Sequence, residues 1–228
     1  MKHQPTMGPE HVARIERWHE SAYRSAQVDT DQTFDYLGRT FVVPPHVHPI
    51  TPVSHLLGQS VLDEVTVADR VLDMGTGCGV NAVLAASRST DVTAVDTNPH
   101  ALAAAKANAE RNGVGDRVHV HHSDVFSDVA GVFDLIVFDP PFRWFTPRDH
   151  LENASTDPGY RALNTFFAAA GDHLAADGRM LIFFGTSGDV DHLRAQADGA
   201  GFAAETVATH GIDKDGWHVD YFTFRMTR

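Results

Sequence analysis

A glycine-rich loop between two acids is the clearest chemical feature of this sequence. It separates the strand-forming run 71–74 from the helix-forming segment 81–86, and a helix N-terminus placed there leaves backbone N–H groups facing a ligand. Three glycines tolerate positive φ and close approach of a ligand to the backbone: Gly75, Gly77 and Gly79. Asp96 ends the next apolar strand about 20 residues later, where a carboxylate can hold ribose hydroxyls. The combination predicts a site for a nucleoside-type cofactor, whereas the glycines alone would predict only a turn.

The glycine spacing separates the candidate cofactors. A dinucleotide fingerprint reads G-x-G-x-x-G, but the third glycine here, Gly79, comes one residue early. Asp73 lies two residues before the first glycine, where it would repel a pyrophosphate but suits a cationic or neutral ligand. The pattern resembles motif I of the class I S-adenosylmethionine (SAM) methyltransferases, and Asp96 resembles their ribose-binding acid. NAD remains the minor alternative.

The tetrapeptide Asp-Pro-Pro-Phe at 139–142 follows a second buried strand. Its prolines stiffen the chain and remove two N–H groups, which leaves the Asp139 side chain and the Pro140 carbonyl as acceptors. An amine, amide or guanidine N–H requires such acceptors, and the Phe142 ring offers a stacking surface for a planar nitrogen group. This tetrapeptide resembles the [D/N]-P-P-[F/Y/W] motif of methyltransferases that modify nitrogen in planar groups. The alternative is a strand-terminating turn.

The resemblance extends to the segment before the glycine loop. Residues 36–54 look like the corresponding segment of the HemK-like protein-glutamine and small-domain RNA-guanine methyltransferases. The glutamine-modifying members usually have Asn-Pro-Pro-Tyr, whereas Asp139 and Phe142 occupy the ends of the motif here. A carboxylate offers no amide donor, so it suits an amino or guanidino group better than a glutamine amide. The resemblance implies SAM as cofactor and nitrogen as methyl acceptor.

The candidate site residues form three groups. The catalytic group is Asp139, Pro140 and Phe142. The cofactor-binding group is Asp73, Gly75, Thr76, Gly77, Gly79, Asp96, Thr97, Asp124 and Val125. The substrate group is His48, Thr51, Pro141 and Arg143. In this interpretation Asp124 accepts a hydrogen bond from an adenine amino group while Val125 packs on the ring, and the alternative for Asp124 is a turn or N-cap aspartate. No histidine pattern completes a metal site, so no metal is expected.

From residue 70 the alternation of strands and helices predicts an α/β fold, a Rossmann-like doubly wound sheet of seven strands. Strands are expected at 71–74, 92–96, 118–122, 133–139, 180–185, 204–209 and 217–226, and helices at 80–88, 98–112, 159–176 and near 189–200. A turn at 213–216 makes the last strand antiparallel. Upstream, we expect a helix over 10–27, a hairpin over 33–43, and a helix capped by Thr51 with Pro52 at its first position. Residues 1–60 would cover the substrate pocket, and 61–228 would form the SAM-binding catalytic domain.

Composition restricts the partners. The 228 residues carry a net charge of −12 and no basic run, so a nucleic-acid substrate is disfavoured without being excluded. Arg143, Arg148 and Arg161 could still cluster in space, their alternative being a solvated rim. A single cysteine, Cys78, fits a reducing compartment. With no apolar stretch of about 18 residues and no secretory signal, we expect a cytoplasmic protein that does not contact a membrane.

These observations support one leading hypothesis and three alternatives. The leading hypothesis is a SAM-dependent N-methyltransferase that acts on a small molecule, an amino acid or a protein side chain. The alternatives are methylation of an RNA or DNA base amino group, a non-catalytic SAM-binding module, and a dinucleotide oxidoreductase, which the glycine spacing disfavours. The oligomeric state cannot be inferred from the sequence.

Overall fold

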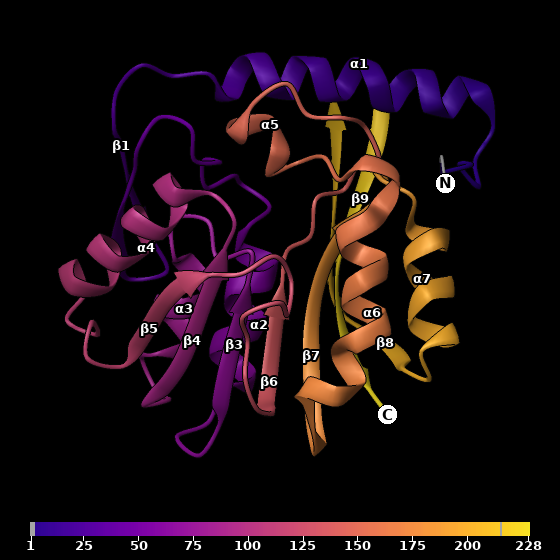
Figure 1. Cartoon of the computed structure of the whole chain (residues 1–228). Helices are drawn as coiled ribbons and strands as arrows, with labels where there is room; N and C mark the ends of the chain where they lie inside the picture. Colours follow the sequence, from indigo (N-terminus) through magenta and orange to yellow (C-terminus); the bar gives the residue numbers. More distant parts are fainter. Residues whose placement is uncertain (1–2, 215) are drawn as a thin grey trace.

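A seven-stranded sheet forms the centre of the computed structural model, which describes residues 3–214 and 216–228 (Figure 1). The strand order is β5-β4-β3-β6-β7-β9-β8. The strands are β3 (Arg70–Met74), β4 (Asp91–Asp96), β5 (Val118–His122), β6 (Phe133–Phe138), β7 (Leu174–Gly185), β8 (Ala203–Lys214) and β9 (Trp217–Thr227). β3 to β7 pair in parallel, whereas β9 is antiparallel to both β7 and β8. The predicted sheet with its antiparallel last strand is confirmed, and β8 forms the edge.

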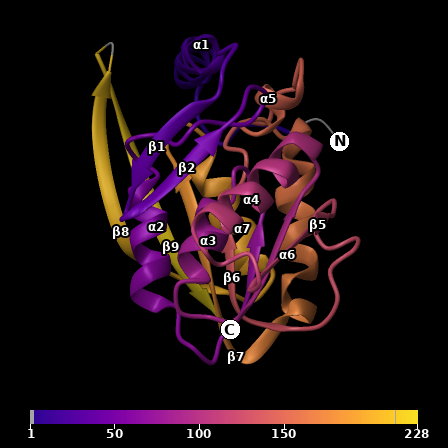
Figure 2. The same cartoon turned by 90° about the vertical axis from the view of Figure 1, so that its left-hand side faces the viewer.

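Helices cover both faces of this sheet, as expected for strands that are buried on each side. On one face α3 (Val80–Ala85) packs between α2 (His55–Glu64) and α4 (Pro99–Arg111), and on the other α6 (Arg161–His173) packs beside α7 (Val190–Gly199) (Figure 2). The central strands β3 and β6 are almost wholly buried.

The chain order creates a switch point at the centre of the sheet. From β3 the chain proceeds to β4 and β5 on one side, and then returns to β6 and β7 on the other. The ends of β3 and β6 are adjacent, because Met74 pairs with Phe138. The glycine loop and the Asp-Pro-Pro-Phe corner therefore leave the sheet side by side, at the place where doubly wound sheets bind ligands.

The N-terminal segment lies over this end of the sheet. Helix α1 (Pro9–Ala26) crosses above the ends of the parallel strands (Figure 1), and a hairpin of β1 (Gln32–Tyr36) and β2 (Arg39–Val43) follows it. The hairpin turns at Leu37 and Gly38, whose φ angles of 47° and 75° belong to a two-residue turn. The expected helix and hairpin are both confirmed.

Several expected boundaries were wrong. Helix α2 begins at His55, not at Thr51 or Pro52, because the Ser54 N–H donates to the Thr51 carbonyl and the Thr51 N–H donates to Ser54 Oγ, at 3.1 Å each. These bonds close a turn ahead of the helix. Helix α3 is three residues shorter than expected, and β7 begins at Leu174 because its first part pairs with Phe133 across a register shift. Strand β8 reaches residue 214, and the expected turn includes residue 215, which lies outside the described residues.

Candidate active site

A cavity of about 710 Å³ lies at the switch point, a volume within the range of small-molecule and cofactor sites. It is bounded by the loops after β3, β4, β5 and β6, by the segment 47–54, and by one face of α1. The predicted residues that line it are His48, Thr51, Gly75, Thr76, Gly77, Asp96, Thr97, Asp124, Val125, Asp139, Pro140, Pro141, Phe142 and Arg143. Among the predicted residues, Asp73 and Gly79 do not line the cavity. Asp73 lies beneath the loop, and Gly79 lies within the loop, against α4.

Asp73 supports the glycine loop from below. Its Oδ2 atom accepts the Thr76 hydroxyl at 2.5 Å and the Ala82 N–H at 3.0 Å, which joins the loop to the start of α3. Burial raises the pKa of Asp73 to about 7; the bonds from Thr76 and Ala82 oppose this rise, and the charge of Asp96 adds to it. The carboxylate therefore fixes the loop and contributes a negative potential beneath it.

Glycine is required at two positions of the loop for different structural reasons. Gly79 has a φ of +86°, and a Cβ atom there would lie 2.8 Å from Ala105 Cα, so glycine lets α4 pack against the loop. Gly77 has a φ of +55° and nothing within 4 Å of its Cβ position. Because Gly77 lines the cavity, its backbone is open to a ligand.

Asp96 connects the loops that follow β3 and β4. Its Oδ2 atom accepts the Gly77 N–H at 2.9 Å and its Oδ1 atom accepts the Asn98 N–H at 2.8 Å. Burial raises the pKa of this carboxyl, and the backbone N–H groups oppose the shift. The carboxylate is thus held rigidly at the cavity wall, in the position expected for a ribose-binding acid.

Asp124 lines the same side of the cavity as Asp96, beyond β5, and forms an ion pair. Its Oδ2 atom lies 3.0 Å from Arg161 Nη1, and both side chains remain partly open to solvent. The neighbouring Val125 is buried and has a φ of +54°. The chain therefore turns sharply here and presents an apolar side chain beside an acceptor.

Asp139 opens into the cavity next to the glycine loop. Within residues 3–214 and 216–228, no group donates a hydrogen bond to the Asp139 carboxylate. Desolvation by the surrounding protein raises the pKa of Asp139 to about 7; the charge of Asp73 adds to the rise and the Arg143 guanidinium opposes it. Asp139 therefore offers uncommitted acceptor atoms and a carboxyl that can change protonation near neutral pH.

The corner that carries Asp139 is braced by aromatic side chains. The Phe142 ring packs with its centroid 4.7 Å from that of Phe184 and 5.6 Å from that of Phe183, on β7. The buried Tyr160 hydroxyl donates to the Phe142 carbonyl at 2.6 Å and accepts the Asp189 N–H at 2.8 Å. Most of the Phe142 ring is consequently buried, so the ring positions the corner as well as lining the cavity.

The three arginines near this corner differ in their environments. Arg148 and Arg161 lie at the surface in ion pairs with Glu152 and Asp124 respectively. Arg143 is only 7% exposed, so a solvated rim was the wrong alternative for this residue. Arg143 lines the cavity, and its guanidinium lies beside the Phe142 ring, with Cζ 5.8 Å from the ring centroid.

His48 lies on the extended segment over the cavity, as expected. The ring opens to the cavity, and desolvation by the protein around it lowers its pKa to about 4, with the Arg143 charge adding to the shift. The imidazole is therefore neutral at physiological pH, and it can donate or accept a hydrogen bond without adding charge.

Helix α1 forms the roof of the cavity and is tied down along its length. His19 Nε2 lies 2.8 Å from Glu152 Oε1 on the short helix α5 (His150–Asn153). The Trp18 ring packs edge-on to Trp217 at the start of β9, with centroids 5.3 Å apart. Before the helix, the Thr6 hydroxyl donates to Asp189 Oδ1 at 2.6 Å. Three contacts from different parts of the fold therefore hold the roof in place.

Sequence reasoning missed Asn108, which connects the hairpin to the glycine loop. This buried side chain donates to the carbonyls of Val42 and Cys78, at 2.9 Å each, and accepts the Val42 N–H at 2.9 Å. Its only signal in the sequence is one amide on the otherwise small and apolar buried face of α4.

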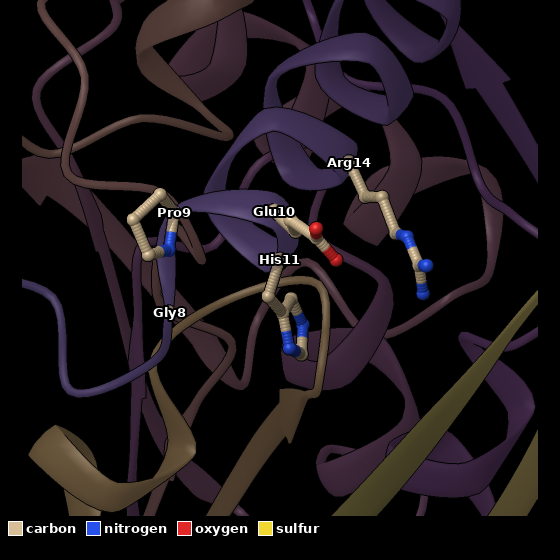
Figure 3. A pocket seen from close by; sticks show the side chains of 5 residues that line it. All are labelled: Gly8, Pro9, Glu10, His11 and Arg14. Carbon is tan, nitrogen blue, oxygen red and sulfur yellow. The ribbon is translucent and has the colours of Figure 1, made fainter.

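A second depression lies at the start of α1 and is lined by Gly8, Pro9, Glu10, His11 and Arg14 (Figure 3). All five residues come from one short stretch of chain, and the depression is open to solvent. It lacks the converging polar groups of the cavity at the switch point, so we assign it no site.

The cavity fits a cationic nucleoside cofactor. The charge of Asp96 raises the pKa of Asp73, and the charge of Asp73 raises that of Asp139. In the part of the chain that the structure describes, none of the three has an arginine or lysine partner at ion-pair distance. Such a cluster favours a positively charged ligand. The sulfonium and α-amino groups of SAM supply that charge, whereas a pyrophosphate would be repelled.

The fold and this site define a class I SAM-dependent methyltransferase domain. The family model "methyltransferase small domain" matches residues 50–196, which is more than half of the chain. The chain therefore belongs to the methyltransferase small domain family. The predicted family and, with it, SAM as the cofactor are confirmed.

Relatives of known type show how varied the substrates are. The chain is 31% identical over 130 residues to ribosomal RNA small subunit methyltransferase C of Vibrio parahaemolyticus, covering 55% of this chain and 35% of that protein. It is 38% identical over 86 residues to ribosomal protein uL3 glutamine methyltransferase of Bradyrhizobium diazoefficiens, covering 36% and 27%. The chain thus spans about a third of the length of the curated relatives it matches.

A solved structure supports the fold. The crystal structure of SMU.776 complexed with SAH superimposes with a TM-score of 0.63 at 15% identity, covering 87% of this chain and 57% of that chain. At this identity the likeness concerns the fold alone. Within the described residues, no helix has the length and apolar character needed to cross a bilayer.

Proposed function

We propose that this chain transfers the methyl group of SAM to a nitrogen atom of a small molecule, an amino acid or a protein side chain. The observation that carries the proposal is the Asp139 carboxylate, which opens into the cavity with uncommitted acceptors beside the glycine loop. A nitrogen that bears hydrogen requires such acceptors.

The residues on the β3, β4 and β5 side would hold the cofactor. Asp96 would accept the ribose hydroxyls, and the backbone at Gly77 would lie against the methionine part of SAM. Asp124 and Val125 would bind the adenine edge and face. The remaining cofactor-binding candidates, Gly75, Thr76 and Thr97, complete this wall of the cavity.

The chemistry requires alignment more than activation. SAM supplies a methyl group on a sulfonium, and transfer forms a carbon–nitrogen bond while the electron pair of the broken carbon–sulfur bond returns to sulfur. Asp139 and the Pro140 carbonyl would orient the N–H groups so that the lone pair faces the methyl carbon. Asp139 would also offset the positive charge that develops on nitrogen. With its pKa near 7, the carboxyl can then accept the proton that nitrogen releases.

The N-terminal segment, residues 1–60, would cover the substrate, and residues 61–228 would form the catalytic domain. The α1 side of the cavity is lined by Trp18, Ala22, Ser25 and Ala26, and the extended segment adds His48 and Thr51. This cover would exclude water from the methyl donor and strengthen the electrostatic contacts inside.

Charge favours a substrate other than nucleic acid. The net charge of −12 and the acidic cavity wall would repel a phosphate backbone. Methylation of an RNA or DNA base is therefore the alternative outcome of the test. A non-catalytic SAM-binding module would have no need of the uncommitted acceptors at Asp139.

The test is transfer of labelled methyl from SAM to separate pools of small amines, amino acids, proteins and RNA. We expect label on nitrogen in one of the first three pools. Asp139→Ala should abolish transfer while SAM still binds in calorimetry, and Asp73→Ala should weaken SAM binding itself. Normal turnover by Asp139→Ala would refute its role, and label in RNA alone would establish the alternative.

A further inference from the structure

Within residues 3–214 and 216–228, Arg143 is a buried cation without an anion. It is 7% exposed, and its Nε atom has no hydrogen-bond partner. Among the residues the structure describes, the guanidinium donates one hydrogen bond, from Nη2 to Ser187 Oγ at 3.3 Å, and no carboxylate reaches it at ion-pair distance. A buried charge is normally paired, because its desolvation is costly.

Other arginines of this chain are paired with carboxylates, as buried or partly buried cations ordinarily are. Arg179 is also largely buried, and its guanidinium lies 2.9 Å from Asp69 Oδ2 and 3.3 Å from Glu64 Oε2. Arg148 contacts Glu152 at 2.6 Å. Arg143 therefore departs from the pattern in the one place where a ligand cavity replaces a protein partner.

The guanidinium is held in position from the backbone outward. The Arg143 N–H donates to the Ser155 carbonyl at 3.3 Å, and its carbonyl accepts the Asp157 N–H at 2.7 Å. The side chain lies against the Phe142 ring, with Cζ 5.8 Å from the centroid. A fork fixed in this way loses little entropy when it binds a planar anion.

Arg143 lies on the side of the cavity away from the cofactor residues. Its neighbours are Ser187, which follows β7, and Tyr221 on β9. The glycine loop, Asp96 and Asp124 follow β3, β4 and β5, on the other side of the switch point. Asp139, the nitrogen-facing acid, lies between the two groups at the end of β6.

We propose that Arg143 binds a carboxylate of the methyl-accepting substrate, so that the substrate carries a carboxylate close to the nitrogen that is methylated. This inference rests on the proposed function and narrows its substrate to amino-acid-like compounds. One positive charge beside the negative Asp139 matches a monoanion better than a phosphate dianion. The fork geometry suits both oxygens of a carboxylate.

The first experiment measures anion binding and not catalysis. Thermal unfolding of the protein saturated with S-adenosylhomocysteine (SAH), the demethylated cofactor, is measured in about 0.2 M sodium acetate and in the same concentration of sodium chloride. We expect acetate to raise Tm by about 2–4 °C over chloride, if acetate is present at about four times its Kd. Arg143→Gln should lose this difference. Arg70→Gln, a change at a half-exposed arginine at the opposite end of the sheet, should retain it.

The cofactor carries a carboxylate of its own, and the SAH-loaded protein separates the two sources. If Arg143 bound the cofactor carboxylate, SAH would occupy the guanidinium, acetate would give no shift, and Arg143→Gln would weaken SAH binding by tenfold or more. That result would overturn the proposal. Unchanged SAH affinity together with loss of the acetate shift in Arg143→Gln would support it.

The second experiment tests the substrate. The twenty amino acids and their decarboxylated amines are compared as acceptors of labelled methyl. We expect kcat/KM for the accepted amino acid to exceed that of its amine by at least tenfold, and Arg143→Gln to remove the preference. Equal or better transfer to the amine would refute the inference. No transfer to any nitrogen compound, with the acetate shift intact, would refute the proposed function and leave the carboxylate site standing.

Discussion

Replacing Asp139 by asparagine should stabilise the protein while it removes activity. The protein around Asp139 raises its pKa from 3.8 to about 7, and a shift of that size corresponds to at most about 4 kcal/mol. Because the carboxylate opens to the cavity, solvent screening reduces the penalty of holding the charged form to about 1–2 kcal/mol. The asparagine amide carries no charge and avoids this penalty.

The gain in stability of Asp139→Asn over the wild type must change with pH in one direction. Between about pH 4 and pH 7 the folded protein keeps the Asp139 proton while the unfolded chain has lost it, so the stability of the wild type falls as pH rises. The advantage of Asp139→Asn is therefore complete above about pH 7 and absent below about pH 4. This dependence distinguishes the electrostatic effect from a general change in packing.

Thermal unfolding of the SAM-free protein measures the effect. At pH 8 we expect Tm of Asp139→Asn to exceed that of the wild type by about 2–8 °C, whereas at pH 4.5 the two should nearly coincide. Asp29→Asn, at an exposed position, serves as the control and should change neither value. Methyl transfer at pH 8 should fall by about 10²–10³. An unchanged or lower Tm at pH 8, or an equal gain at both pH values, would refute the reasoning.

Three further predictions concern the cofactor loop and the corner. Asp73→Asn should weaken SAM binding about tenfold in calorimetry, and wild-type affinity should rise as pH increases through about 7, where Asp73 loses its proton; a flat profile would contradict this. Gly79→Ala should destabilise the fold by about 1–3 kcal/mol, because its φ is +86° and the new Cβ would lie 2.8 Å from Ala105 Cα; denaturant unfolding tests it. Tyr160→Phe should cost about 1–3 kcal/mol, since the hydroxyl bonds to Phe142 and Asp189 would be lost; stability equal to the wild type would show that those bonds contribute nothing.

The sequence was sufficient for the sheet and for the loops that follow its strands. Continuous apolar runs such as 133–138 indicate strands buried on both faces, and the glycine loop and Asp96 mark the ends of two of them. Because parallel strands end at a common edge, the position of both Asp96 and Asp139 at one cavity follows from topology without any side-chain detail.

Burial of individual polar side chains was not predictable in the same way. Arg143 and Arg161 are both arginines near one loop, yet only Arg143 is buried. Phe142, Ser187 and Tyr221 lie around Arg143, whereas Arg161 faces solvent. Asn108 acts through carbonyl groups on a hairpin more than sixty residues away in sequence. Periodicity reports which face of a helix is apolar, and it does not identify distant partners.

The site combines features that oppose folding and favour binding. Asp73, Asp96 and Asp139 have pKa values raised chiefly by burial, and Arg143 is buried with no carboxylate at ion-pair distance among the described side chains. Each is unfavourable in the empty protein, and under our proposals each would be relieved by a ligand of opposite charge, a cation on the glycine-loop side and a carboxylate on the β7–β9 side. The scaffold can tolerate this because the central strands are buried on both faces and α1 is anchored at several points. A cavity with separated charges of both signs would discriminate against ligands that are anionic throughout. It would favour a cationic cofactor on the glycine-loop side together with a substrate carboxylate on the β7–β9 side.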